Sequence, residues 1–123
     1  MSLSSIRSIK HHEVDKLNER IQLVAMDEPG SGGANHHYLI YIEGRPVTEL
    51  RFQKGPLKKA GYNGISNKAL LSILIDRMEG FINGPYPSEE TEQAHIHLMR
   101  AMEALHSRTR ERISRGVEGT HQK

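Results

Sequence analysis

The stretch 66-SNKALLSILIDRMEGFINGPYPSEETEQAHIHLMRAMEALHSRTRERISRG-116 decides the fold of this chain. It contains two apolar runs with the three- and four-residue spacing of amphipathic helices. Between them lies NGPYP at 83–87, whose glycine and two prolines interrupt a helix. Two helices joined by so short a connection pack as an antiparallel hairpin. The sequence therefore predicts a helical hairpin over residues 66–123.

The first predicted helix begins after Ser66, which is a good N-cap residue because its hydroxyl can accept a backbone N–H bond. Its apolar residues form two adjacent stripes, and a face this wide is expected to pack on a sheet and also on a partner helix. The stripes are Leu70, Leu74, Met78 and Phe81, and beside them Leu71, Ile75 and Ile82.

The second predicted helix runs from Glu89 to Ser114. The negative charges of Glu89 and Glu90 in its first turn interact favourably with the positive end of the helix dipole. Gly116 is expected to end the helix. Its expected buried stripe is Leu98, Met102, Leu105, Thr109 and Ile113.

Upstream of the hairpin, the pattern indicates extended chain. Strands are expected in RIQLVAM from residue 20, in HHYLIYIE from residue 36 and in PVTELRFQ from residue 46, with a turn at EGR and a connecting loop at KGPLKKAGYNGIS. Alternating side chains and the intervening turn residues are typical of a small antiparallel meander. The predicted fold class is therefore α+β, with an antiparallel sheet over residues 17–65 followed by the hairpin.

Residues 1–16 are polar and rich in serine and histidine, and they predict a mobile arm or a short helix used in assembly. Residues 17–123 are then expected to form a single domain. Hydrophobic residues are only 36% of the 123-residue chain, so subunits are expected to share a core in an oligomer. The absence of cysteine, of a signal peptide and of a membrane-length apolar run indicates a protein of the cytoplasm.

Arg108, Arg112 and Arg115 share one face at the end of the second helix. Three permanently charged guanidiniums on one face favour capture of an anion such as phosphate. In the alternative interpretation they complement the helix dipole and pair locally with Glu103, Glu111 and Glu118. If the anion carried a base, Phe81 or Tyr86 could supply a stacking ring.

Other kinds of site find little support. The paired histidines His36–His37 and His95–His97 diverge in space, and no metal motif is present, so no metal site is expected. No nucleophile motif or acid–base pair suggests an enzyme. The loop PGSGGAN at 29–35 lacks the ending of a phosphate loop and is expected to connect two strands, although its glycines can bring backbone N–H groups against a ligand.

Five segments between Leu17 and His121 stand out: LNERI, DEPGSGGANH, FQKGPLKKAGYNGISNKALL, IDRMEGF and RTRERISRGVEGTH. Together they resemble the first type of phage Thoeris anti-defence sponge, whose helical hairpin is shared with the anti-CBASS sponges. The resemblance implies an antiparallel sheet followed by two helices, assembled as dimers that build a hexamer, a trimer of dimers.

The resemblance also implies a function: binding and sequestering cyclic ADP-ribose isomers made by bacterial TIR-domain proteins, without cleavage and without a cofactor, in the cytoplasm of the infected bacterial host. Some members also hold cyclic di- or trinucleotides. Carried over to this chain, Phe81 stacks on the adenine, Arg108 and Arg112 meet the pyrophosphate, and the loop with Gly32, Gly33, Asn35 and His36 lines a pocket between subunits. Thr91 stands where relatives have asparagine and Glu89 where they have arginine, and an acidic Glu89 disfavours a second anion site nearby.

Two other functions stay open at this point. A small nucleic-acid-binding or regulatory phage protein could use the same arginines, although a formal net charge of only +2 argues against it. A protein that serves only in assembly would bind no ligand at all.

Overall fold

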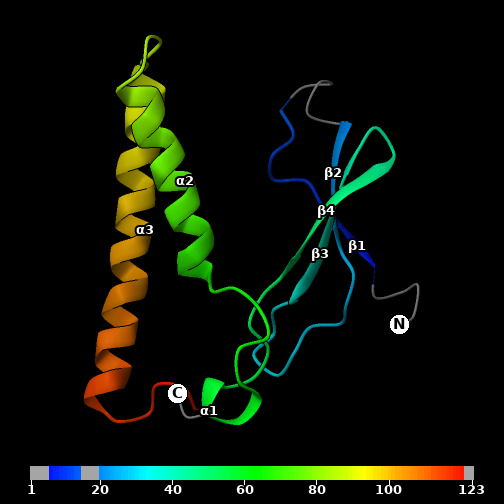
Figure 1. The fold of residues 1–123 in the computed structure, drawn as a ribbon, viewed down its shortest axis with the longest axis vertical. Helices are drawn as coiled ribbons and strands as arrows, with labels where there is room; N and C mark the ends of the chain where they lie inside the picture. The colour runs from blue at the N-terminus through cyan, green and yellow to red at the C-terminus, as the bar shows by residue number, and fades with distance from the viewer. Residues whose placement is uncertain (1–5, 15–19, 121–123) are drawn as a thin grey trace. The chain divides into compact units, whose positions relative to one another are not determined.

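The computed structural model describes residues 6–14 and 20–120 of the chain. They form four strands and three helices (Figure 1). The strands are β1 (Arg7–Ile9), β2 (Ile21–Ala25), β3 (His37–Ile42) and β4 (Arg45–Arg51), and the helices are α1 (Leu57–Ala60), α2 (Asn67–Ile82) and α3 (Glu89–Ser114). The predicted α+β class and antiparallel sheet are confirmed. Among the described residues, none of the helices has both the length and the apolar character needed to span a membrane.

The chain divides into two compact units. The sheet unit comprises residues 1–54 and 62–65, and the helical unit comprises residues 55–61 and 66–123. The chain therefore passes from one unit to the other three times. The predicted boundary between residues 65 and 66 is one of these passages, and the grouping of residues 17–123 as a single domain stays a prediction.

The sheet is fully antiparallel, with the strands in sequence order. β3 and β4 are joined by the tight turn at Glu43 and Gly44, both with positive φ, as two-residue hairpins with right-handed twist require. The three expected strands are β2, β3 and β4. Pro46 lies in β4, which is an edge strand and so can accommodate a missing N–H.

The expectation of an arm or short helix at residues 1–16 is wrong for Arg7–Ile9. These residues form β1, which pairs with β2 in the register Arg7 with Ala25 and Ile9 with Leu23. The strand is only three residues long and its partner lies more than ten residues away, so its stability comes from the neighbouring strand and not from its own sequence pattern. Residues 1–5, 15 and 16 of the predicted arm lie outside the described residues.

The connection between sheet and helices is also more ordered than expected. Leu57–Ala60 form the single-turn helix α1, which follows Pro56 and ends at Gly61 (φ 67°). Beyond it, the Asn63 side chain accepts from the Lys54 amide and donates to the Lys54 carbonyl. A Cβ on Gly64 would lie 2.4 Å from the Phe52 carbonyl carbon, so this approach of two backbones requires glycine.

In the helical unit, α2 and α3 pack side by side (Figure 1). Lys68 near the start of α2 donates to Thr109 near the end of α3 at 2.7 Å. Glu79 near the end of α2 contacts His95 near the start of α3 at 3.0 Å. Two helices with contacts in this order run antiparallel. Ser66 and Ser88 are the N-caps, accepting from the amides of Ala69 and Thr91.

The burial of the two helices differs from the prediction in three places. Leu98, Met102, Leu105 and Thr109 are half-buried along α3, but Ile113 is 61% exposed. On α2, Leu74 and Phe81 are exposed although they were expected in the buried stripe. The position predicted for Ile113 is taken by its neighbour Arg112, because the chain reverses after α3 and covers that side of the helix.

Candidate functional site

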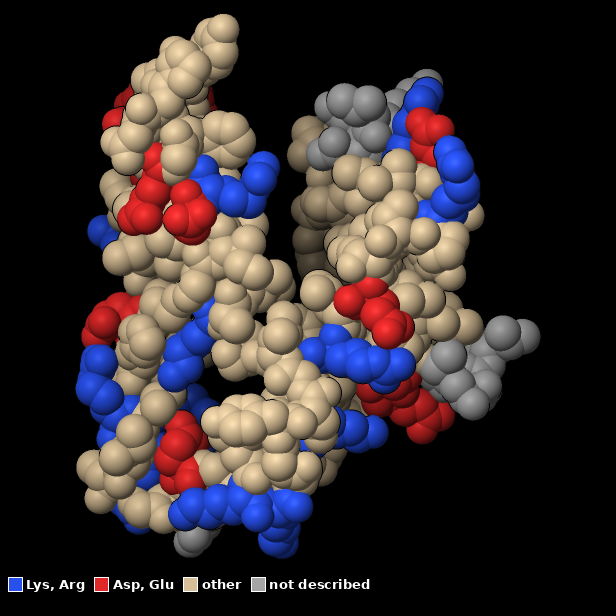
Figure 2. Space-filling model, viewed as in Figure 1, with Lys and Arg blue, Asp and Glu red and all other residues tan. Residues whose placement is uncertain are grey.

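The arginines at the end of α3 do not form one ladder of free donors. Arg112 pairs with Glu118, Arg115 with Glu111, and Arg110 with Glu103. The alternative that made Glu103, Glu111 and Glu118 local salt-bridge partners is therefore confirmed for all three carboxylates. Figure 2 shows basic side chains gathered over the end of the helical unit that carries α1 and the last turns of α3.

Arg108 differs from these neighbours. Its side chain is exposed, and within residues 6–14 and 20–120 its guanidinium makes no hydrogen bond or ion pair. An unpaired guanidinium keeps its full set of donors for an external anion, and a bidentate contact to phosphate is the strongest use of that geometry.

Arg112 is buried, with 5% of its surface exposed. Its donors point to the chain that follows α3: Nε to Glu118 at 3.1 Å, and Nη2 to the carbonyls of Val117 and Thr120 at 2.8 and 3.1 Å. Partial burial alone would raise the pKa of Glu118, but the hydrogen bond and positive charge of Arg112, with the Gly119 amide, hold this pKa below its usual 4.5. The structure therefore places Arg112 inside the protein, where the sequence predicted a ligand contact.

Phe81 lies near the end of α2 and is 48% exposed. The Arg77 guanidinium carbon lies 5.4 Å from the centre of its ring, in cation–π range. An exposed ring with a guanidinium on it is a stacking surface suited to a planar base.

Thr91, in the first turn of α3, belongs to the cap of that helix. Its amide donates to the Ser88 hydroxyl at 3.1 Å, and the Ser88 hydroxyl donates to Thr91 Oγ1 at 2.8 Å. The Thr91 hydroxyl retains its own proton as a donor.

The glycine-containing loop between β2 and β3 is closed on itself around Asp27. The Asp27 carboxylate accepts from the amides of His36 and His37 at 3.0–3.2 Å, and Asn35 donates to the Asp27 carbonyl. Burial acts to raise the pKa of Asp27, but these amide donors and the Asn35 side chain bring the pKa below its usual 3.8. The loop connects β2 and β3, as expected.

Within this loop, the predicted ligand residues have different surroundings. Asn35 is buried, and its side-chain oxygen accepts from Arg7, so its amide serves the loop. Gly32 and Gly33 are exposed with open space where a Cβ would stand. His36 is half-buried against Gly30, and its Nδ1 has no hydrogen-bond partner among the residues that the structure describes.

His36 borders a pocket of about 290 Å³ in the sheet unit, which is lined also by Asp27, His37, Arg51, Phe52, Lys54 and Asn63. Sequence reasoning missed Arg51, Phe52 and Lys54 as neighbours of the glycine loop. The signal was present in the strand pairing, because Arg51 lies opposite His37 at the end of β4. Arg51 and Lys54 give this pocket two cationic side chains that suit a phosphate or carboxylate group.

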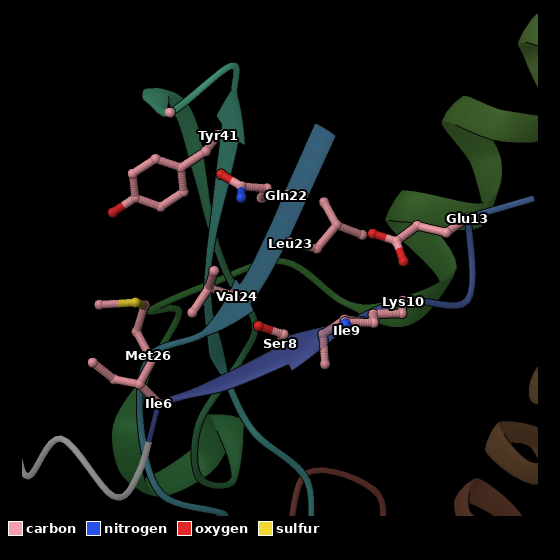
Figure 3. A pocket seen from close by; sticks show the side chains of 11 residues that line it. Ile6, Ser8, Ile9, Lys10, Glu13, Gln22, Leu23, Val24, Met26 and Tyr41 are labelled. Atoms are coloured by element: carbon pink, nitrogen blue, oxygen red, sulfur yellow. The ribbon is translucent and has the colours of Figure 1, made fainter. Parts of the chain in front are cut away.

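A second pocket of about 490 Å³ lies on the sheet, where β1, β2 and β3 meet (Figure 3). Its floor carries Val24 and Ser8, with Ile6, Met26 and Tyr41 around them. This pocket was not predicted because β1, which supplies one wall, was not recognised. No group of three or more histidine or carboxylate side chains in the described part of the chain is arranged to hold a metal ion.

The predicted ligand residues thus lie in both units and, within the helical unit, at both ends of α3. Gly32, Gly33, Asn35 and His36 belong to the sheet unit, while Phe81, Thr91, Arg108 and Arg112 belong to the helical unit. Within the helical unit, Thr91 and Arg108 are about 17 residues apart on one continuous helix, roughly 25 Å at 1.5 Å per residue. Phe81 lies at the Thr91 end, because α2 and α3 are antiparallel. One chain therefore does not bring Phe81 and Arg108 onto the same small ligand.

Comparison with known proteins identifies a relative over most of the chain. No family model matches the sequence. The protein described as "Thoeris anti-defense 1" from Bacillus phage SBSphiJ7 is 35% identical over 94 residues, which cover 76% of this chain. The match spans 66% of that relative, so just under two thirds of its length is represented. This similarity, over segments that include both the sheet and the helices, shows that the chain belongs to the Thoeris anti-defence family.

Proposed function

We propose that this protein is a phage anti-defence protein that binds a cyclic ADP-ribose-type signal and sequesters it unaltered, without catalysis or a cofactor, in the cytoplasm of the infected cell. The observation that carries the proposal is the guanidinium of Arg108, which has no ion pair within the described residues, beside three arginines that are already neutralised by carboxylates. Together with family membership, this observation makes Arg108 the candidate in the last turns of α3 to bind an anionic ligand. Withholding a signal from its receptor requires tight binding and slow release, and bidentate guanidinium contacts to phosphate favour both.

Each ligand site is expected to draw on two copies of the chain. Phe81, with Arg77 over its ring, offers a surface for the adenine, but it lies at the Thr91 end of the hairpin, and Thr91 is roughly 25 Å along α3 from Arg108 within one copy. A small cyclic nucleotide is far shorter than that distance. An antiparallel pair of hairpins would bring Phe81 of one copy to Arg108 of the other, and the exposed apolar residues Ile73, Leu74 and Met99 offer a surface for the pairing. The implied dimer, and the hexamer built from it, fit this requirement.

The identity of the ligand is tested by thermal shift with a panel of cyclic ADP-ribose isomers and cyclic dinucleotides. A ligand that binds only the native state raises the melting temperature. We expect a shift with at least one isomer, lost in Arg108→Ala and in Phe81→Ala. Arg100→Ala is the matched control, because Arg100 is another exposed arginine of α3. Equal shifts in all variants would contradict the assigned site.

The fate of the ligand separates sequestration from catalysis. The protein is incubated with the product of a TIR-domain enzyme, heated to denature it, and the supernatant is analysed by chromatography. Intact ligand is expected, and a degraded ligand would make the protein an enzyme. Retardation of DNA or RNA that weakens with salt would favour the alternative of a nucleic-acid-binding regulator.

The two-copy site is tested by complementation. Phe81→Ala and Arg108→Ala subunits are each expected to bind poorly, but co-expressed subunits regain sites that combine an intact Phe81 with an intact Arg108. Random assortment restores roughly a quarter of the sites in a two-fold symmetric pair. No recovery, with mixed oligomers demonstrated by mass, would mean that each site is built from one copy.

A further inference from the structure

The reversal after α3 is built around the side chain of one buried arginine. Gly116 has φ 73°, a conformation that favours glycine, and it turns the chain back toward α3. The Val117 amide then donates to the Arg112 carbonyl at 3.0 Å, and Val117 is buried. The Arg112 guanidinium completes the closure through Glu118 and the carbonyls of Val117 and Thr120. The Arg112 side chain therefore bonds to three of the four residues 117–120, and the amide of the fourth, Gly119, donates to Glu118.

The same segment contacts the other helices of the unit. The Lys58 amide of α1 donates to the Gly119 carbonyl at 3.4 Å, and the Lys58 side chain lies along Gly119. Lys68 of α2 adds a positive charge near Glu118 and donates to Thr109, the residue after Arg108. Residues 117–120 thus join α1, α2 and α3 at the end of the unit where Arg108 stands.

A guanidinium in this position is poorly placed to bind an external anion. It is 5% exposed, and turning outward would break its ion pair and leave the carbonyls of Val117 and Thr120 without their charged donor. A buried charge that loses its partner is strongly unfavourable. Arg108, one turn earlier, has no such commitment within the described residues.

We propose that Arg112 and Glu118 form a latch that positions the anion-binding end of the helical unit, and that Arg112 is a positioning residue while Arg108 grips the phosphate. The proposal rests on the proposed function. It assigns different roles to Arg108 and Arg112, the two arginines that the resemblance places at the pyrophosphate. The latch closes residues 117–120 over the last turns of α3, and so holds Lys58, Lys68 and Arg108 at one end of the unit.

Glu118→Gln distinguishes this role from direct contact. If Arg112 gripped the ligand itself, removing the competing negative charge of Glu118 would leave affinity unchanged or increase it. If Arg112 acts through the latch, Glu118→Gln weakens binding in the same direction as Arg112→Ala. Glu111→Gln is the matched control, since it breaks the exposed Arg115 pair at the same end of α3.

The experiment measures affinity for the cyclic ADP-ribose isomer that gives the largest thermal shift, by calorimetry, at a temperature where circular dichroism shows every variant folded. We expect about a tenfold loss for Arg112→Ala, about a threefold loss for Glu118→Gln, and no additional loss when the two are combined, as for two residues that act as a unit. Arg112→Lys, which keeps the charge and one donor direction, is expected to recover part of the loss. Unchanged or tighter binding in Glu118→Gln, or additive losses in the double variant, would overturn the proposal.

A second measurement needs no ligand. Hydrogen exchange of the amides of Val117, Gly119 and Thr120 is expected to be at least about tenfold faster in Glu118→Gln than in wild type, and unchanged in Glu111→Gln. Unchanged exchange in Glu118→Gln would mean that the pair is no latch. If the wild-type protein bound none of the cyclic ADP-ribose isomers, the proposed function would fail, and exchange alone would then decide whether the latch exists. If Arg112→Ala does not fold, Glu118→Gln still gives both readouts.

Discussion

The loop between β2 and β3 and the turn after α3 are closed in opposite ways. In the sheet unit, a carboxylate stands at the centre: Asp27 accepts from backbone amides of His36 and His37. In the helical unit, a guanidinium stands at the centre: Arg112 donates to two backbone carbonyls and to Glu118. A carboxylate accepts from the free backbone amides at the start of a strand, while a guanidinium donates to the free backbone carbonyls beyond a helix end. The comparison shows why Arg112, although arginine is often a ligand contact, has a structural role here: its donors satisfy backbone carbonyls of the turn.

The largest effect on stability is expected where the central charge is buried. Arg112→Ala leaves carbonyls and Glu118 without their donor and should lower the free energy of unfolding by about 2–4 kcal/mol, below the full cost of a broken buried pair because Glu118 is 39% exposed. Urea denaturation measures the loss. Arg115→Ala, which breaks an exposed pair, should cost less than about 1 kcal/mol. Equal costs would remove the contrast between the two arginines.

A smaller loss is expected when the centre of the other turn is removed. Asp27→Ala leaves the His36 and His37 amides without their acceptor, at about 1–3 kcal/mol. The loss should be smaller than for Arg112→Ala, since water can reach a half-buried loop. Glu43→Gln, which alters the exposed Arg20 pair of the same unit, is the control for loss of charge alone. An Asp27→Ala variant as stable as this control would show that the loop does not depend on its carboxylate.

Acid should loosen both turns, because Asp27 and Glu118 have pKa values below their usual 3.8 and 4.5. A carboxyl with a lowered folded pKa adds stability above its unfolded pKa and loses it as the pH falls through the folded value. The free energy of unfolding should therefore decrease from about pH 5 downward, and the decrease should be shallower in Asp27→Asn and in Glu118→Gln. Identical slopes in wild type and variants, measured by urea titration at each pH, would mean that neither carboxyl contributes.

The smallest effect on stability is expected at Arg108. Arg108→Ala should change the free energy of unfolding by less than about 0.5 kcal/mol, as for exposed sites in general, while it abolishes the ligand-induced thermal shift. The same two measurements on Arg112→Ala should show losses in both. If Arg108→Ala destabilised the protein as Arg112→Ala does, the two arginines would share one structural role.

The helices were predictable because their signals are local. Ser66, Ser88 and the NGPYP breaker lie within a few residues of the boundaries they determine, and α2 and α3 begin and end as expected. β1 was not predictable, because three residues in a polar segment become a strand only through pairing with β2. The single turn of α1, between Pro56 and Gly61, is too short for any periodic pattern.

The site was predictable only in part, for the same reason. Helical spacing places Arg108 and Arg112 near one another on α3, but it does not show that Gly116 returns the chain to cover Arg112 and leave Arg108 open. The burial of Asn35 likewise depends on Arg7, a residue of the unpredicted strand. Arg51 reaches the neighbourhood of His36 only through the pairing of β3 with β4.

The triple passage of the chain between its two units has a practical consequence. A single cut between residues 65 and 66 would leave α1 on the fragment with the strands and separate Lys58 from the Gly119 carbonyl that it contacts. A cut between residues 54 and 55 would instead separate Lys54 from Asn63. Each half consists of two separate segments, so neither can be obtained whole by truncation, and swapping a half between relatives requires the exchange of two segments together.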